Sequence, residues 1–147
     1  IGNEAQQQLK NHYDKMMEAR VAGAVADTWQ RVKEQVEWVR ERMDAVLQYD
    51  PDKLEEQKVF DDDGNLKSVE IKKPRRPKLY DSMLEQGLAL TDMLRDLNVT
   101  GDPRLEEARQ DLERALTRID MDSLKESTEL QQSTRTAMQN IIDKFAL

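Results

Sequence analysis

The chain of 147 residues contains no cysteine. Disulfides, thiolate nucleophiles and thiolate metal ligands are therefore excluded. Glycine and proline are scarce, with 5 and 4 copies, and aromatic residues make up only 5%, whereas charged residues reach 36%. This balance favours long amphipathic helices over a β-sandwich or barrel. We expect an all-α fold in a single domain over residues 1–147, because a chain of this length buries a core without crosslinks.

Long apolar runs are also missing from the sequence. No segment approaches the roughly 18 apolar residues that a membrane-spanning helix needs, and no signal-peptide pattern opens the chain. We therefore expect a soluble, cytoplasmic protein with no membrane partner. The chain begins with Ile1 rather than Met, and the helical pattern is already present from Glu4, so we interpret it as a fragment of a longer protein.

The net charge of −7 is unevenly distributed. A connector over residues 72–78 concentrates five positive charges, on Lys72, Lys73, Arg75, Arg76 and Lys78. The acidic remainder repels nucleic-acid phosphates, so these five are the only candidates for phosphate contact. The connector lacks aromatic residues on which bases stack, and its two prolines favour an extended backbone. A solvated linker is therefore the favoured interpretation.

A long helix is predicted over residues 3–48. Seven apolar residues recur at alternating spacings of four and three and form one stripe: Val25, Trp29, Val32, Val36, Val39, Met43 and Val46. This stripe is the predicted core face. Trp38 points to the opposite side of the helix, and the apolar residues before Gly23 lie near the direction of Trp38. The buried face therefore changes sides near Gly23, where we expect a kink or a different packing layer.

The predicted interaction surface consists of large apolar and aromatic side chains outside the core stripe, together with one arginine. Its residues are Leu9, Tyr13, Met16, Met17, Trp38, Arg42 and Tyr49. Trp and Tyr are enriched in interface hot spots, which favours Trp38 as an anchor for a partner. Two alternatives remain for Trp38: Arg42 stacks on its ring, or a β-hairpin covers it.

A small β-hairpin is predicted over residues 58–71, inserted between helices. Asp50-Pro51 ends the long helix, and a short turn over residues 52–57 is expected to follow. The strands, 58–60 and 66–71, are joined through residues 61–65, where Gly64 or Asn65 takes a positive φ. An isolated hairpin is marginal in water, so its apolar side chains are expected to pack on something.

Helices fill the remainder, residues 82–146. Ser82 and Glu85 fit a capping box at the start of a helix over 82–97. Residues 98–103 predict a tight corner, with Asn98 as C-cap, Asp102 as N-cap and Pro103 at the first helical position. The following helix is expected to pack antiparallel to its predecessor. A turn or short helix over 120–126 and a last helix complete an antiparallel bundle of about four main helices.

No residue pattern predicts catalysis, a cofactor or a metal. Asp61, Asp63 and Asn65 have the alternating spacing of a calcium loop, but Leu66 occupies the required glycine position and Lys72 the required glutamate, so a hairpin turn is favoured. His12 lacks the carboxylate of a di-iron helical motif. Three acidic side chains of the long helix are predicted to form a solvated face with salt bridges to neighbouring cations. They are Glu34, Glu37 and Glu41. Phosphate-binding, nucleophile-elbow and zinc-protease motifs are absent.

The stretch from Leu79 to about Ala146 resembles the C-terminal helical part of an uncharacterised protein family of tailed bacteriophages and prophages. The residues that carry the resemblance are Asp81, Ser82, Leu94, Leu97, Asn98, Val99, Thr100, Asp102, Pro103 and Leu105. The resemblance implies a phage origin, a bacterial host cell and a helical tail domain. It implies no activity, because the family has none assigned.

We therefore expect a non-catalytic helical module for protein interaction or oligomerisation. Its partner is a second copy or another phage or host protein. One alternative is a nucleic-acid-associated factor that uses the basic connector. Another is an acidic mimic of DNA that inhibits a host enzyme, a hypothesis that rests on net charge alone.

Overall fold

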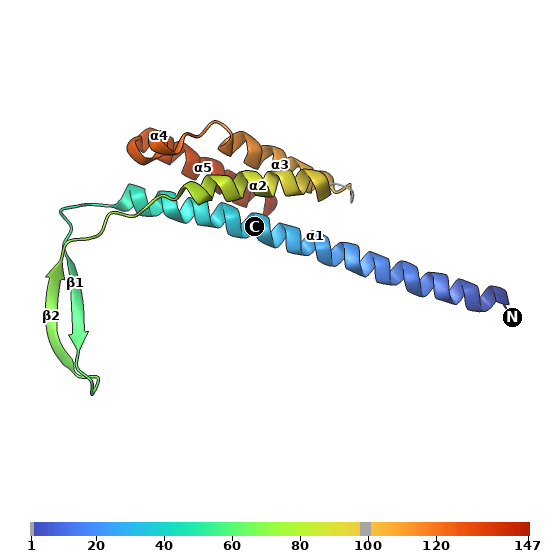
Figure 1. Cartoon of the computed structure of the whole chain (residues 1–147), viewed down its shortest axis with the longest axis horizontal. Coiled ribbons are helices and arrows are strands. Elements are labelled where there is room, and N and C mark those ends of the chain that lie inside the picture. Colours follow the sequence, from blue (N-terminus) through green and yellow to red (C-terminus); the bar gives the residue numbers. More distant parts are fainter. Residues whose placement is uncertain (1, 98–100) are drawn as a thin grey trace.

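The computed structural model describes residues 2–97 and 101–147. The elements follow in the order α1 (Gly2–Gln48), β1 (Glu55–Phe60), β2 (Leu66–Lys72), α2 (Asp81–Leu97), α3 (Pro103–Leu116), α4 (Met121–Glu126) and α5 (Thr128–Phe145). The fold is predominantly α-helical, with one antiparallel two-stranded sheet, as the sequence predicts (Figure 1). The helices form a body, from which the first half of α1 and the hairpin project.

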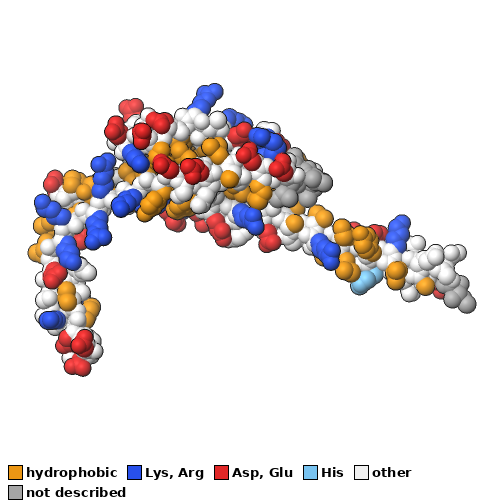
Figure 2. All heavy atoms as spheres, in the orientation of Figure 1, with side chains coloured by type: hydrophobic (Ala, Val, Ile, Leu, Met, Phe, Trp, Pro, Cys, Tyr) orange, Lys and Arg blue, Asp and Glu red, His pale blue; other side chains and the backbone are white. Residues whose placement is uncertain are grey.

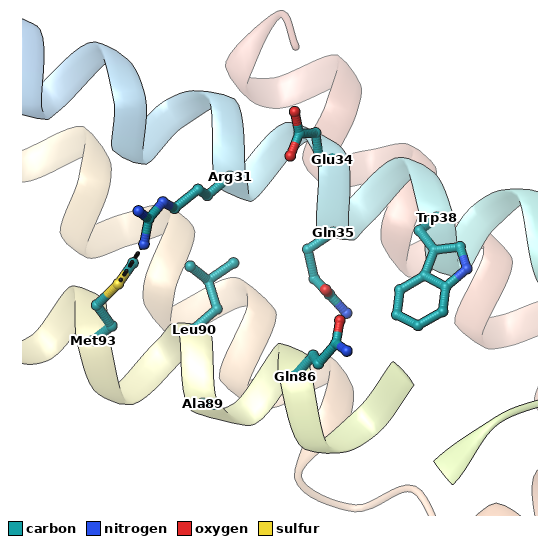
Figure 3. Close-up of a pocket in the computed structure, with 8 residues that line it drawn as sticks. All are labelled: Arg31, Glu34, Gln35, Trp38, Gln86, Ala89, Leu90 and Met93. Atoms are coloured by element: carbon teal, nitrogen blue, oxygen red, sulfur yellow. Dashed lines mark hydrogen bonds between the residues drawn. The ribbon is translucent and has the colours of Figure 1, made fainter. Parts of the chain in front are cut away.

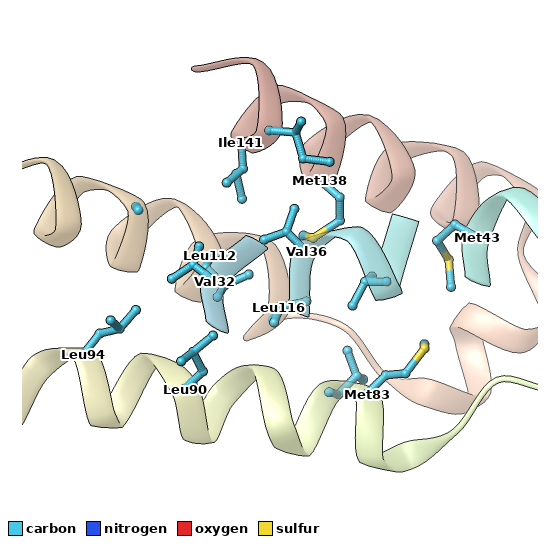
Figure 4. Close-up of a cluster of buried hydrophobic side chains, with 14 of the residues drawn as sticks. Val32, Val36, Met43, Met83, Leu90, Leu94, Leu112, Leu116, Met138 and Ile141 are labelled. Atoms are coloured by element: carbon cyan, nitrogen blue, oxygen red, sulfur yellow. The ribbon is translucent and has the colours of Figure 1, made fainter. Parts of the chain in front are cut away.

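The second half of α1 packs against α2 and α5. Val32, Val36, Val39 and Met43 are fully buried there (Figure 4). The other three stripe residues, among them Trp29, are half-buried and pack at the edge of the same core. The predicted core stripe is therefore confirmed. The helix also runs through Gly23 without interruption, so the expected break or kink is absent. The passage from exposed to buried side chains takes place along one continuous helix.

The remaining helices close the core by packing α3 against both α2 and α5. In Figure 1, α3 runs antiparallel to α2, as predicted. The largest fully buried side chains of these helices are Met83, Leu112, Leu116, Leu124 and Met138. Each such side chain contributes roughly 1.5–3 kcal/mol to folding. The body is therefore held mainly by apolar burial shared among elements far apart in the chain.

Side chains cap three of the helices at their N-termini. Asp102 accepts a hydrogen bond from the backbone N–H of Arg104, and Pro103 begins α3, so this part of the predicted corner is confirmed. Asn98, the predicted C-cap, lies outside the described residues. α4 and α5 are capped by Asp120 and Ser127. The predicted capping box is wrong, because α2 begins at Asp81 and Ser82 is already inside the helix.

Gly87 is a point of close approach between α2 and its neighbours. A Cβ atom at this position would lie 2.3 Å from Cδ1 of Leu116 and 3.3 Å from Nε2 of Gln35. Leu116 is buried and belongs to α3, so it has little room to move. The contact between α2 and α3 therefore requires a residue without a side chain at position 87.

The hairpin forms with the predicted turn. The backbone N–H groups of Asp63 and Asn65 both donate to the Asp61 carboxylate, and Gly64 has φ 83°. Strand β1 begins at Glu55, however, so residues 55–57 belong to the strand and the prediction that they form part of a turn is wrong. The hairpin also leaves the body, with Phe60 58% exposed, so the expectation that it packs on another element is wrong (Figure 1).

Among the described residues, no helix combines the length and the apolar character needed to cross a membrane.

Candidate interaction surface

The first half of α1, residues 2–24, is hereafter called the projecting half. Every one of its side chains is exposed. The exposed fraction is 76% for Leu9 and 61% for Tyr13, and Met16, Met17 and Val21 are also exposed. Figure 2 shows hydrophobic side chains gathered on this rod, next to the single histidine. The four residues predicted here as interaction sites are thus all exposed on the projecting half.

The projecting half is electrically neutral, unlike the chain as a whole. Its three basic side chains are balanced by three acidic ones: Lys10, Lys15 and Arg20 against Glu4, Asp14 and Glu18. The net charge of −7 therefore resides in the rest of the chain. A neutral helix with large exposed apolar side chains is suited to protein contact, because association brings little charge repulsion with it.

The second half of α1 borders a groove that it shares with α2 (Figure 3). The groove has a volume of about 530 Å³ and is lined by Arg31, Glu34, Gln35, Trp38, Gln86, Ala89, Leu90 and Met93. Two hydrogen bonds fix its walls. Gln35 Nε2 donates to the Met83 carbonyl at 2.9 Å, and Arg31 Nη1 lies 3.2 Å from Met93 Sδ. The groove is thus a stable surface of the body and is open along α1.

Trp38 lies at one end of this α1–α2 groove. Its indole is half-buried and packs against the edge of the core. The hairpin does not cover it, because the hairpin projects at the far end of the body (Figure 1). Trp38 therefore has one side supported by the body and one side open in the groove, which is the arrangement of an anchor residue.

Arg42 and Tyr49, the other two predicted interaction residues, have different surroundings. Arg42 lies over the ring of Tyr80, 5.5 Å from its centroid, and donates to the Lys78 carbonyl. The predicted stacking of Arg42 on Trp38 is therefore wrong. Arg42 instead holds the segment that leads into α2 against α1. Tyr49 is half-buried just after the end of α1.

The basic connector, residues 72–78, is exposed at all five of its cationic side chains. Lys72 forms an ion pair with Glu70 at 3.7 Å. Arg76 donates to the Lys125 carbonyl at 3.4 Å. In the part of the chain that is described, the side chains of Lys73, Arg75 and Lys78 make no ion pair. The connector is thus an accessible but loosely organised group of charges.

The acidic side chains of the second half of α1 do not pair as predicted. Glu34 accepts a hydrogen bond from Gln30, and neither it nor Glu37 or Glu41 forms an ion pair with any described residue. The neighbouring cations reach other helices instead; Arg40, for example, donates to Gln139 of α5 at 3.3 Å. The predicted ion pairs of this face are therefore wrong for the described residues, whereas Glu34 and Glu41 are solvent-exposed as predicted. Across the described ranges, no group of three or more His, Asp or Glu side chains is placed to hold a metal.

Ion pairs of the body lie both within α3 and between α3 and α5. Arg109 donates to Glu106 and Glu113 on α3, and its hydrogen bond lowers the pKa of the Glu106 carboxyl below its usual value. Lys144 of α5 lies 2.8 Å from Asp111 of α3, and this hydrogen bond raises the pKa of the Lys144 ammonium. Both shifts accompany ion pairs made by side chains of α3.

No protein-family profile, no curated protein and no solved structure matches the chain. The resemblance of residues 79–146 to phage proteins therefore stays a prediction.

Sequence reasoning missed the α2 side of the groove. Gln86, Ala89 and Met93 were not predicted as surface residues of interest, because nothing in the pattern of α2 shows which of its sides faces α1. One signal was available: Gly87 in the middle of a predicted helix indicates close packing at that point. A groove beside a close helix contact is the expected consequence.

Proposed function

We propose that this chain is a non-catalytic protein-association module. In this proposal the second half of α1, with α2, α3 and α5, forms an antiparallel four-helix bundle that presents two docking elements, the projecting half and the α1–α2 groove. The observation that carries the proposal is the projecting half itself, whose large apolar side chains are exposed.

Helix physics supports a partner for the projecting half. The projecting half continues from the packed second half of α1 but has no packed neighbours of its own, so it lacks the tertiary packing that supplies most helix stability in proteins. Gly23 weakens the segment further, by about 1 kcal/mol relative to alanine. Covering Leu9, Tyr13 and Met16 would remove apolar surface from water and stabilise the helix at the same time. Association with a partner would therefore stabilise the helical structure of this segment.

Site-specific photo-crosslinking in cells that carry the native gene tests the proposal. A photoreactive phenylalanine derivative replaces Tyr13, and the matched control places it at Lys15, which lies on the other side of the same exposed helix. We expect a protein adduct from position 13 and much less from position 15, whatever the mass of the captured partner. Equal adduct formation at both positions, or none at position 13, would contradict the proposal.

The second candidate function is nucleic-acid association through the basic connector, favoured by the exposure of all five cations. Binding through about five phosphate contacts would weaken steeply with salt. A mobility-shift measurement at low salt compares the natural chain with a variant in which the five cations are replaced by glutamine. Loss of binding in the variant supports this function, and no binding by either protein removes it.

A further inference from the structure

We infer that the partner of the projecting half is a second copy of this chain, paired antiparallel along one face of α1 about a two-fold axis between Gly23 and Ala24. The inference deepens the proposed function and rests on it. It follows from the order of residues along one side of α1, from their charges and from the place of Gly23.

One face of α1 runs from the projecting half directly into the α1–α2 groove. At about 100° per residue, eight residues fall within about 60° of one another on this face. They are Leu9, Tyr13, Met16, Arg20, Asp27, Arg31, Glu34 and Trp38. The last three line the groove, and all eight are exposed or half-buried. A second helix can therefore lie along this whole face without disturbing the core.

The order of these residues is self-complementary. Each residue before the midpoint between Gly23 and Ala24 has a counterpart at the same distance after it. The pairs are Leu9 with Trp38, Tyr13 with Glu34, Met16 with Arg31, and Arg20 with Asp27. A two-fold axis at the midpoint brings each residue opposite its counterpart in the other copy, so that every pair forms twice, as an isologous interface requires.

The chemistry of the four pairs is compatible. Leu9 meets the open side of the Trp38 indole in the groove of the other copy. The Tyr13 hydroxyl is placed to donate to the Glu34 carboxylate. Met16 lies beside the aliphatic stem of the Arg31 side chain.

The fourth pair brings opposite charges together. Arg20 and Asp27 are exposed, and neither forms an ion pair with a described residue of its own copy. Across the two-fold axis the Arg20 guanidinium faces the Asp27 carboxylate, and the same contact recurs on the other side. The face as a whole carries two positive and two negative charges. The net charge of −7 on each chain therefore does not oppose contact along it.

The inference also explains Gly23. A glycine inside an exposed helix costs about 1 kcal/mol relative to alanine. Within a single copy nothing lies within 4 Å of a Cβ atom at this position, so one chain alone gives no steric reason for glycine. At the crossing point of two helices the reason is clear, because the absence of a side chain lets the two backbones approach closely. Ala24, on the other side of the two-fold axis, is also small.

A charge-exchange series tests the pairing by sedimentation velocity over a range of protein concentrations. Arg20→Glu places glutamate opposite Asp27, and Asp27→Arg places arginine opposite Arg20. Each single change should raise the dimer dissociation constant about tenfold, because two attractive pairs become repulsive. The double variant Arg20→Glu/Asp27→Arg should restore association. Lys15→Glu is the matched control, since it makes the same charge change on the opposite side of the projecting half and should leave association unchanged.

The absence of natural cysteine permits a second, geometric measurement. Single cysteines are introduced by Ala24→Cys and by Asn3→Cys, and each protein is treated with a short bis-maleimide. Antiparallel pairing brings the two copies of position 24 together and separates the two copies of position 3 by the length of the interface. We expect efficient crosslinking at 24 and none at 3, whereas a parallel dimer would crosslink at both.

Several outcomes overturn the inference: a chain that stays monomeric, a dimer whose association does not respond to the charge exchange, or crosslinking at position 3. These outcomes leave the proposed function standing if position 13 still captures a different protein in the cell. Absence of an adduct at position 13 overturns the proposed function. Circular dichroism of each variant verifies folding, which should be unchanged because positions 20 and 27 are exposed.

Discussion

The two halves of α1 belong to one uninterrupted helix, but they are stabilised in different ways. In the second half Val32, Val36 and Val39 are completely buried between α2 and α5. In the projecting half Leu9 is 76% exposed, and none of the described residues 2–24 has even intermediate burial. Both halves follow the apolar spacing of an amphipathic helix. The difference shows that the spacing determines which side of a helix is apolar, whereas tertiary packing decides whether that side is covered.

The hairpin repeats this contrast at the other end of the molecule. Its backbone is well paired, with Lys58 opposite Val69 and Glu56 opposite Ile71. Phe60, Val69 and Ile71 are nevertheless exposed. Local hydrogen bonding and a well-formed turn are therefore enough to define an element of this protein, but not to place it against the body.

The largest expected effect is on the stability of the body, when one negative charge is introduced into either half of α1. Val36→Asp should destabilise the body by more than about 3 kcal/mol, because it buries an unpaired carboxylate among apolar side chains. Val21→Asp makes the same change in the projecting half, where the side chain is exposed, and should leave the thermal midpoint of the body almost unchanged. Thermal unfolding followed by circular dichroism measures both. Equal losses would show that the comparison of the two halves is mistaken.

An intermediate effect is expected from the two helical glycines. Gly87→Ala should destabilise the body by ~1–3 kcal/mol, because the new methyl group displaces Leu116 from a filled core. Gly23→Ala should instead stabilise the helix of an isolated chain by up to about 1 kcal/mol, because helix propensity rises and no atom lies near. Urea unfolding in dilute solution measures each free energy. Stabilisation by Gly87→Ala would show that α2 and α3 are packed more loosely than described.

The smallest effect concerns acid sensitivity of the body. The hydrogen bond from Arg109 lowers the pKa of Glu106 in the folded chain below the reference value of 4.5. The pairing therefore stabilises the folded state above pH 4.5, and this contribution is lost as the pH falls through the lower, folded-state pKa. As the pH falls from neutral to acid, the free energy of unfolding should therefore decrease less in the Glu106→Gln variant than in the natural chain.

The urea midpoint at several pH values, from neutral to acid, measures this difference. Glu4→Gln in the projecting half is the control, since Glu4 is exposed and lies outside the body. A pH dependence that is the same in the natural chain and in Glu106→Gln would show that the pair with Arg109 does not persist in solution.

Much of the fold was predictable because its signals are local. The spacing from Val25 to Val46 identifies the buried side of α1, and Asp102-Pro103 marks the start of α3 through the bonding capacity of one side chain and the fixed φ of the next. The turn at Gly64 follows from the same kind of reasoning. The predicted first residues of β1 and α2 were less accurate, because no residue type marks unambiguously where this strand or this helix begins.

The candidate site was predictable only in part. Leu9, Tyr13 and Met16 were identified because they lie off the core stripe, and the structure places them on an exposed rod. The support of Trp38 by the body, and the contact of Arg42 with Tyr80, depend on where α2 approaches α1. No pattern within α1 contains that information, because the hydrogen bonds that join α1 to this region connect residues 48 and 36 positions apart in the chain.

The sequence by itself determined the helical class, the core side of α1, the start of α3 at Asp102-Pro103 and the hairpin turn. These depend on residues within one or two turns of one another. Only the tertiary structure decided that α1 is half buried and half projecting, that a groove opens beside Trp38, and that the hairpin stands free of the body. The physical reason is that burial is a property of contacts between distant segments, and the chain supplies enough packed helices to cover just one half of α1.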